Sequence, residues 1–368
     1  PVVILHGGPG GYALDMMDYW LNALRLVRRD HDLIVLDQRG VGYSEPSLNC
    51  PEAEQQWYQA WTEDLSQTEV DQRYAEGLQQ CHDRLAAEGI NLSAYTSAAN
   101  AADLEDLRQA LGYDQWNLYG SSYGTRLALT IMRDFPSGVR SVVLDSVYPP
   151  QVDLYATLGV NAERALNLIF QRCAADADCN QAHPDLKTSF YQLVDQLDAE
   201  PRTFKLIHPS TDEVYKVILN GDRLIWVFFQ MLYMTDQVPL LPWRIDTLLG
   251  GASSNIMEIL GWTIFFYNFW SEGMYHSVQC SEEVSFSSPE AVDKANAAVT
   301  ARFLAGLDRT PMFQYCSDWV DMSSVPEGEN QAVVSDIPTL ILSGEFDPIT
   351  PPAWGQLAAE TLSRSQYL

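Results

Sequence analysis

The chain has 368 residues, of which 46% are hydrophobic and 19% charged, a globular composition that excludes disordered and fibrous classes. It carries 22 Lys and Arg against 49 Asp and Glu, and this formal charge of −27 disfavours binding to nucleic acid or to anionic lipid. Apolar runs stay below the roughly 18 residues of a membrane span; residues 224–234 and 256–270 come closest, and polar groups interrupt both.

The first 150 residues alternate short apolar runs with helical patterns. Such alternation predicts an α/β fold with a mostly parallel sheet and helices on both faces. Strands are expected at residues 2–5, 32–36, 116–119 and 141–145, and helices at 101–111 and 125–133.

The pattern changes after residue 150. Residues 151–335 are mainly helical and aromatic-rich, with no regular strand rhythm, and are expected to form a cap or lid. Residues 336–368 return to the sheet core, with a strand at 338–344 and a helix at 354–362. The chain opens directly on a strand without an initiator Met or a signal peptide, and residues 364–368 resemble the beginning of a further strand. We therefore expect it to be truncated at both ends.

The six cysteines lack C-x-x-C spacing and a histidine at zinc-ligand spacing, so no metal site is expected, and no cofactor motif is evident. Their even number is compatible with three disulfides and an oxidising compartment. Six buried free thiols in a cytosolic protein are the alternative, and spacing alone favours disulfides only slightly.

Residues 120–124 read Gly-Ser-Ser-Tyr-Gly, between an expected strand and an expected helix. Glycines flank such a turn because it is too tight for larger residues, and the turn exposes the hydroxyl of Ser122 at a helix N-terminus. Negative charge is favoured there, so we interpret Ser122 as a nucleophile rather than as an ordinary turn residue. Ser121 is interpreted as a small spacer.

Two further segments follow expected strands. Residues 6–10, His-Gly-Gly-Pro-Gly, leave backbone N–H groups free for an oxyanion hole, which we assign to Gly8 together with Tyr123. A phosphate loop is disfavoured because its motifs are missing. Residues 343–348, Ser-Gly-Glu-Phe-Asp-Pro, end the last expected strand, and Asp347 is the predicted acid that orients a catalytic imidazole. Glu345 is its local rival.

These segments, with Asp-Gln-Arg-Gly-Val-Gly-Tyr-Ser at 37–44, resemble the α/β-hydrolase serine peptidases of the prolyl iminopeptidase and tripeptidyl-aminopeptidase-like family. The C-terminal segment is similar to the TAP-like region of that family. The resemblance implies cleavage at free peptide N-termini by Ser122 and Asp347. Asp37 ends the second expected strand beside an arginine and two glycines, so we expect it to tie loops together rather than to react. The resemblance also implies an extracytoplasmic location, periplasmic or secreted, and disulfides joining Cys50–Cys81, Cys173–Cys179 and Cys280–Cys316.

The histidines depart from this pattern. All six precede Asp347, whereas the family places its base in a loop after the next strand. We therefore expect the catalytic histidine to lie beyond Leu368 and this segment to be close to inactive by itself.

The cap is expected to set specificity. Its aromatic side chains either wall an apolar cleft or form the cap's own core, and the core is favoured for most of them. They are Trp226, Phe228, Phe229, Tyr233, Trp243, Trp262, Phe265, Phe266 and Trp270. An exopeptidase needs a carboxylate to hold the substrate ammonium, and Glu282 and Glu283 are the candidates; a solvated acidic pair is the alternative.

The sequence thus predicts a serine aminopeptidase that releases proline or short peptides through an acyl-enzyme. A carboxylesterase or lipase-like enzyme with the same triad is the second reading, because the fold does not fix the acyl substrate. A non-catalytic binding protein with a hydrolase fold is the third. The number of residues released and the oligomeric state are left open.

Overall fold

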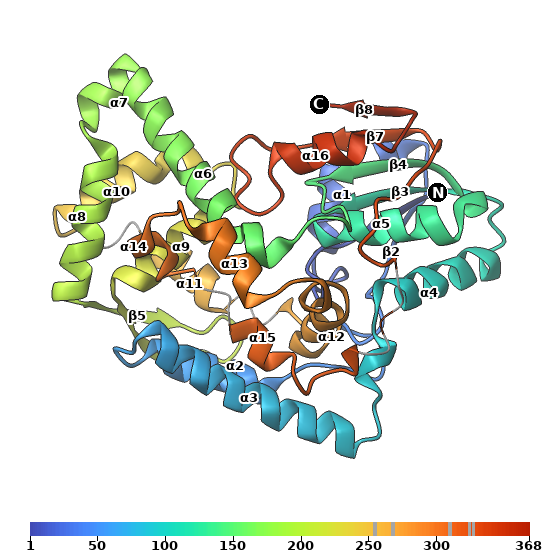
Figure 1. Cartoon of the computed structure of the whole chain (residues 1–368), viewed down its shortest axis with the longest axis horizontal. Helices are drawn as coiled ribbons and strands as arrows, with labels where there is room; N and C mark the ends of the chain where they lie inside the picture. The colour runs from blue at the N-terminus through green and yellow to red at the C-terminus, as the bar shows by residue number, and fades with distance from the viewer. Residues whose placement is uncertain (253–255, 266–268, 308–310, 323–324, 326–327) are drawn as a thin grey trace.

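A parallel β-sheet forms one half of the molecule (Figure 1). The computed structural model describes residues 1–368 except 253–255, 266–268, 308–310, 323–324 and 326–327. Within those residues the sheet has six strands in the order β2-β1-β3-β4-β7-β8, and each neighbouring pair is parallel. The strands are β1 (Val2–Leu5), β2 (Leu33–Val35), β3 (Trp116–Ser121), β4 (Val139–Asp145), β7 (Thr339–Leu342) and β8 (Ser365–Tyr367).

Strand β1 shows why the sheet needs helices on both faces. All four of its residues are buried, and alternate side chains enter different clusters. Val3 and Leu5 pack with helices on one face, whereas Val2 and Ile4 pack with Trp20 on the other. The helices concerned are α1 (Met17–Ala23), α4 (Ser97–Ala110), α5 (Tyr123–Asp134) and α16 (Pro352–Ala359). These elements confirm the predicted fold class.

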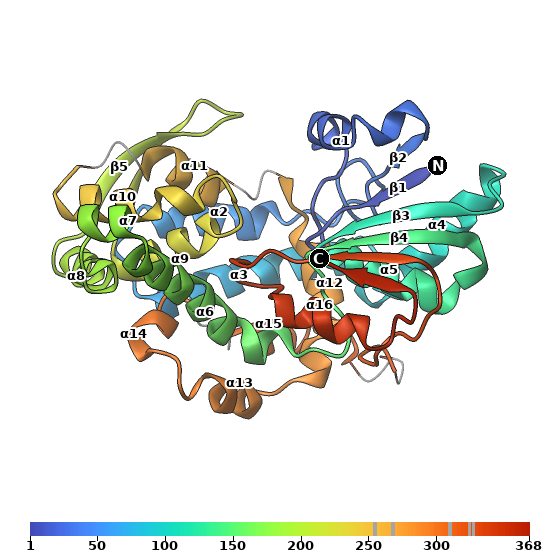
Figure 2. The ribbon, with the colours of Figure 1, turned by 90° about the horizontal axis from the view of Figure 1, so that it is seen from above.

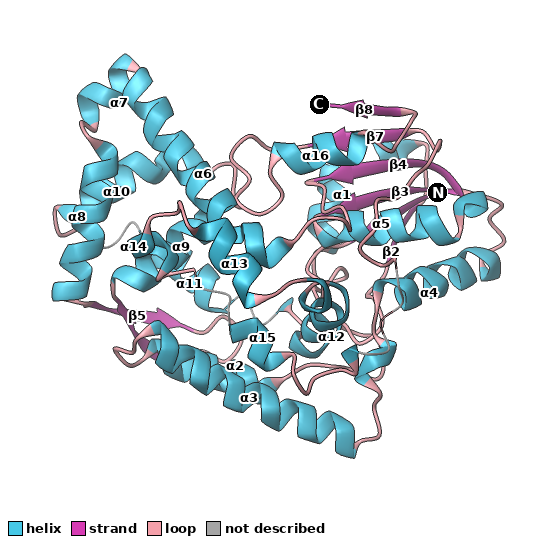
Figure 3. Cartoon of the chain, viewed as in Figure 1, coloured by secondary structure: helices cyan, strands magenta, loops and turns pink. Residues whose placement is uncertain are grey.

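The cap forms the other half and is mainly helical (Figures 2 and 3). Its helices are α6 (Leu154–Ala175), α7 (Ala177–Ala182), α8 (Leu186–Ala199), α9 (Gly221–Met231), α10 (Leu241–Leu249), α11 (Met257–Phe265), α12 (Glu272–Glu282), α13 (Pro289–Asn296), α14 (Ala301–Leu304) and α15 (Pro311–Tyr315). In both views α12 lies between the other cap helices and the sheet. Among the described helices, none is long and apolar enough to cross a membrane.

The cap also contains an antiparallel hairpin that the sequence analysis missed. Strands β5 (Arg202–Ile207) and β6 (Val214–Leu219) pair along their full length. Phe204 and Leu206 are buried and alternate with exposed residues, as expected of a strand with one face on a core. The hairpin was missed because it is a single short pair inside a helical segment.

Two helices from the first 150 residues also pack in the cap layer. Helices α2 (Pro51–Trp61) and α3 (Gln67–Ala87) run along its lower edge in Figure 1. Tyr58 and Trp61 of α2 belong to the same buried cluster as the cap residues Phe190 and Phe228. The sheet core is therefore interrupted twice, first by α2 and α3 and then by residues that follow β4.

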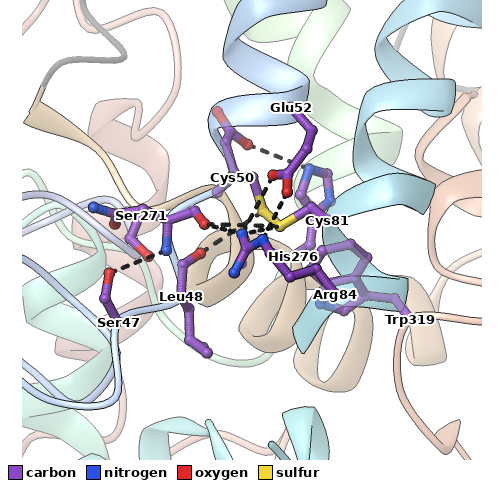
Figure 4. Close-up of a disulfide and its surroundings, with 12 residues drawn as sticks. Ser47, Leu48, Cys50, Glu52, Cys81, Arg84, Ser271, His276 and Trp319 are labelled. Atoms are coloured by element: carbon purple, nitrogen blue, oxygen red, sulfur yellow. Dashed lines mark hydrogen bonds and ion pairs between the residues drawn. A yellow bond between two sulfur atoms is a disulfide. The ribbon is translucent and has the colours of Figure 1, made fainter. Parts of the chain in front are cut away.

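All three predicted disulfides are confirmed, with Cα–Cα separations of 5.3, 5.1 and 5.1 Å for Cys50–Cys81, Cys173–Cys179 and Cys280–Cys316. Figure 4 shows Cys50–Cys81, which joins the start of α2 to α3. Arg84 lies beside it and donates to a Glu52 carboxylate oxygen at 2.6 Å. The alternative of free thiols is wrong, because no described cysteine is unpaired.

Candidate active site

Ser122 occupies the tight turn between β3 and α5. Its φ of 53° lies in the left-handed region, which a non-glycine residue adopts only when its surroundings enforce it. One enforcing contact is the Ser122 N–H, which donates to the Asp145 carbonyl at the end of β4 at 3.0 Å. The strained turn places Ser122 at the N-terminus of α5 and at the carboxyl edge of the sheet, where ligands bind in this class of fold.

The glycines of the turn are required by close packing. A Cβ on Gly120 would lie 2.4 Å from the Gly124 carbonyl oxygen, and a Cβ on Gly124 would lie 1.8 Å from the Leu5 carbonyl oxygen. Both distances are below any real contact between such atoms. The spacing of the glycines therefore follows from how closely α5 approaches β1 and β3.

The glycine-rich loop that follows β1, residues 6–11 and called the glycine loop below, packs directly on Ser122. A Cβ built on Gly7 would lie 3.6 Å from Ser122 Oγ, and Gly8 has a φ of +132°. Asp37 braces this loop, because one carboxylate oxygen accepts the N–H groups of Ala13 at 2.8 Å and Leu14 at 3.0 Å. The structural role expected for Asp37 is thus confirmed.

Tyr123, the other predicted oxyanion donor, is the first residue of α5. The N–H groups of a first helical turn have no intrahelical acceptor, which makes them available to an oxyanion. Its side chain is fully buried. The structure therefore places Tyr123 directly after Ser122 and Gly8 in the loop whose Gly7 packs on Ser122, while the role of Gly8 and Tyr123 as donors stays a prediction.

Asp347 lies in the loop after β7, at the same sheet edge as Ser122. The register pairs Ser121 with Asp145 and Asp145 with Leu342, so the loops that follow β3 and β7 are two strands apart. A spacing of about 5 Å per strand separates them by roughly 10 Å, which suits an acid and a nucleophile that share an intervening base.

Hydrogen bonds hold the Asp347 carboxylate in place. Its Oδ1 accepts the N–H groups of Ile349 at 2.9 Å and Thr350 at 2.7 Å, and its Oδ2 accepts the Thr350 hydroxyl at 2.6 Å. Burial raises the pKa of Asp347, and these hydrogen bonds, with one from Ser146, act in the opposite direction. Glu345 instead forms an exposed ion pair with Arg172 at 2.5 Å, which leaves Asp347 as the better placed acid.

Glu282 and Glu283 lie inside the protein, so the alternative of a solvated acidic pair is wrong. Their side chains are 2% and 4% exposed, and both contact the equally buried guanidinium of Arg126 on α5. Burial raises the pKa of Glu283 to about 7, although Arg126 pulls in the opposite direction. Binding of a substrate ammonium by Glu282 and Glu283 stays a prediction. The ammonium would have to compete with the Arg126 guanidinium for these two carboxylates.

Five of the six histidines contact side chains other than Ser122 and Asp347: His6 contacts Trp20, His82 Asp83, His183 Asp246, His208 Tyr58 and His276 Glu272. Burial lowers the pKa of His6 to about 4, and its ring packs edge-on against Trp20 behind the glycine loop. His276 Nε2 lies 3.4 Å from Glu272 Oε2 within α12. The remaining four lie before β2, in α3, after α7 and in the β5–β6 turn: His31, His82, His183 and His208.

The cap aromatics divide between core and surface, and fewer of the described ones are buried in the cap's own core than the sequence analysis expected; Trp226 packs against that core partly buried. Phe228, Phe229 and Phe265 are buried in the cap's own core. Trp270 lies over the glycine loop instead, because a Cβ on Gly8 would be 3.4 Å from its Cη2. Tyr233, Trp243 and Trp262 are at least a third exposed, and Phe266 lies outside the described residues.

The sequence analysis missed two arginines that contact candidate site residues or the loops that carry them. Arg126 pairs with Glu282 and Glu283, and Arg164 of α6 reaches the Asp347 loop. One signal was available for Arg126, since it stands among apolar residues in the first half of α5, where an arginine is rarely buried without a partner. The Arg164 contact spans 183 positions and leaves no local pattern.

Two family models match the chain. The alpha/beta hydrolase fold matches residues 1–203, and the TAP-like protein model matches residues 301–368. The chain is 25% identical over 381 residues to the serine protease Hip1 of Mycobacterium tuberculosis, covering 95% of this chain and 70% of that protein. Tripeptidyl aminopeptidase of Streptomyces lividans is 33% identical over 162 residues, covering 40% and 28%. Proline iminopeptidase of Xylella fastidiosa is 29% identical over 153 residues, covering 40% and 32%. Together with the sheet order and the strained serine turn, these matches show that the chain belongs to the α/β hydrolase fold family.

Proposed function

We propose that this chain is part of a serine aminopeptidase in which Ser122 is the nucleophile. The observation that supports this proposal most strongly is the position of the Ser122 hydroxyl. It lies against the glycine loop, at the same sheet edge as Asp347. The Ser122 oxygen attacks the carbonyl carbon of an N-terminal peptide bond, while its proton passes to a base. The N–H groups of Gly8 and Tyr123 stabilise the oxyanion that forms.

The second half of the reaction completes the cycle. The base returns its proton to the leaving amine, the peptide bond breaks, and water hydrolyses the acyl-enzyme at Ser122. We assign the base to a histidine that Asp347 orients and that is not one of the six in this chain. Five of those six contact other side chains, and His31 is exposed before β2. Conservative replacement of the exposed His31 should accordingly leave turnover unchanged.

Peptide substrates are favoured over simple esters by the relatives. Hip1 is named a serine protease, and two other relatives are named a tripeptidyl aminopeptidase and a proline iminopeptidase. The formal charge of −27 also supports attraction of cationic peptide N-termini. The three disulfides fit an oxidising compartment, and we place the protein outside the cytoplasm, in the periplasm or secreted.

The test compares Ser122→Ala with Ser121→Ala in the complete natural protein. Substrates are aminoacyl and tripeptidyl reporters with free or acetylated N-termini, together with a short-chain ester. We expect Ser122→Ala to lower turnover by about three orders of magnitude or more, with folding intact, and Ser121→Ala to be mild. Acetylation should abolish cleavage of the peptides.

Other results decide between the alternatives. Turnover of the ester alone, or of acetylated and free peptides equally, would establish an esterase or an endopeptidase instead. Failure of the wild-type protein both to turn over any reporter and to react with a fluorophosphonate at Ser122 would favour the non-catalytic binding protein.

A further inference from the structure

Helix α12 contacts both sides of the candidate oxyanion hole. At its N-terminus, Ser271 donates its N–H to the Gly10 carbonyl of the glycine loop at 2.8 Å. At its C-terminus, Glu282 is bonded to the first residue of α4, Ser97. Both Ser271 and Glu282 are buried, so these contacts are shielded from water.

A chain of hydrogen bonds continues from Glu282 to Tyr123. Glu282 Oε1 accepts the Ser97 N–H at 2.5 Å, and Glu282 Oε2 accepts the Ser97 hydroxyl at 2.7 Å. Ser97 Oγ also lies 2.8 Å from the Tyr123 hydroxyl. A hydroxyl has one proton to donate, and the carboxylate takes that of Ser97, so Tyr123 donates to Ser97. The phenol of the predicted oxyanion donor is thereby tied to the cap helix.

Arg126 fixes the carboxylate end of this chain. Its Nε lies 3.1 Å from Glu282 Oε2, and its Nη2 donates to the Glu282 carbonyl at 3.0 Å. Its Nη1 donates to Glu283. Because Arg126 is one turn beyond Tyr123 on α5, the same helix contacts Glu282 directly and through Ser97. Two carboxylates and one buried guanidinium thus hold α5, α4 and α12 in one arrangement.

We propose that α12 acts as a strut that sets the separation of the two oxyanion donors, with Glu282 as its positioning residue. This inference rests on the proposed roles of Ser122, Gly8 and Tyr123. An oxyanion hole stabilises the transition state only when both donors meet the developing charge at hydrogen-bond distance. The strut joins Gly10, two residues from one donor, to Tyr123, the other.

The most specific test is Tyr123→Phe, which removes only the hydroxyl and keeps the ring and the backbone N–H. Its matched control is Tyr155→Phe, because Tyr155 is also buried and donates to Gln279 of α12 at 3.0 Å, outside the Ser97 chain. Both variants remove a buried phenol hydroxyl that is linked to α12, that of Tyr123 through Ser97 and that of Tyr155 directly through Gln279. Only the first should change the oxyanion donor.

For Tyr123→Phe we expect kcat to fall about ten-fold, with KM nearly unchanged, on free peptides and on the ester alike. The affinity of a peptide aldehyde or boronate, which forms an oxyanion-like adduct, should fall by the same factor. Tyr155→Phe should stay within about two-fold of wild type in both measurements. Thermal unfolding of the two variants checks that they lose similar stability.

Equal effects of Tyr123→Phe and Tyr155→Phe on kcat would overturn the proposed role of α12 as a strut. Glu282→Gln gives a second measurement: a positioning role lowers kcat for all substrates. A rise in KM confined to substrates with a free N-terminus would instead assign Glu282 to ammonium binding and overturn the inference. If the wild-type protein cleaves only esters, the proposed function fails, but the comparison of Tyr123→Phe with Tyr155→Phe on the ester still decides on the strut.

Discussion

Arg164 of the cap donates a 2.6 Å hydrogen bond to the main-chain carbonyl of Asp347. A second bond, of 2.9 Å, runs from the same guanidinium to the Glu345 carbonyl. The loop that carries the candidate acid is therefore held from outside by α6, in addition to its own bonds through Ile349 and Thr350. Cap and sheet are therefore in contact at the candidate acid as well as at the candidate oxyanion hole.

Replacing Arg164 should lower activity more than stability. Arg164→Met keeps the apolar stem and removes both bonds, so the Asp347 loop loses an anchor and kcat should fall several-fold, about three- to ten-fold. Steady-state kinetics on the peptide reporter measures the effect. Arg172→Met is the matched control, because Arg172 lies on the same helix and reaches the same loop through an ion pair that is 63% and 52% exposed. An equal loss in the control would contradict a specific role for Arg164.

Removing the Thr350 hydroxyl should shift the acid limb of the pH profile upward. Its bond to Asp347 Oδ2 favours the ionised carboxylate, and burial already raises the pKa of Asp347. In Thr350→Val the pKa of Asp347 should rise further, so activity that requires the carboxylate is lost at a higher pH as the solution is acidified. The profile of kcat/KM against pH measures this shift. A downward shift would show that Thr350 does not stabilise the charged form.

Substituting Gly124 should destabilise the fold. In Gly124→Ala the new Cβ would meet the Leu5 carbonyl oxygen at 1.8 Å, so α5 or β1 must move, and we expect a loss of about 3 kcal/mol or more, or insoluble protein. Gly261→Ala in α11 is the control. Its Cβ meets nothing within 4 Å, and alanine favours a helix, so a gain of roughly 0.5–1 kcal/mol is expected. Denaturant unfolding of both variants checks the prediction, which a tolerated Gly124→Ala would refute.

His6 should make the fold sensitive to mild acid. Burial lowers its pKa from 6.5 to about 4, so between these pH values the unfolded chain binds a proton that the folded chain does not. Stability therefore falls as pH decreases through that window, by at most about 3 kcal/mol from this group. His6→Phe keeps a ring against Trp20 and should remove this share of the loss, whereas His31→Phe, at an exposed position, should not. Unfolding free energies at pH 7 and 4.5 provide the measurement, and an unchanged loss in His6→Phe would exclude His6 as its source.

The sequence by itself determined the parallel sheet, the serine turn and the positions of Ser122 and Asp347 after strands. These features are local: a buried strand is a short apolar run, and a turn as tight as the one at Ser122 admits only glycine at 120 and 124. The disulfide pairs came from family resemblance and from proximity in the chain, since spacing alone favoured disulfides over free thiols only slightly. The sequence predicts a base other than the six histidines, and in the structure the Asp347 carboxylate accepts hydrogen bonds from Ile349 and Thr350.

Only the tertiary structure decided what the charged residues of the cap do. From the sequence, Glu282 and Glu283 could be an acidic pair in a binding cleft or on the solvent-exposed surface. In the structure both are buried against Arg126, which lies more than 150 positions earlier in the chain. Arg164 and Asp347 are likewise far apart in sequence. A buried charge needs a partner, yet the partner's identity is set by how whole helices pack rather than by any local pattern. For this reason local sequence predicts the nucleophile and the acid, whereas the contacts that position them appear only in the folded molecule.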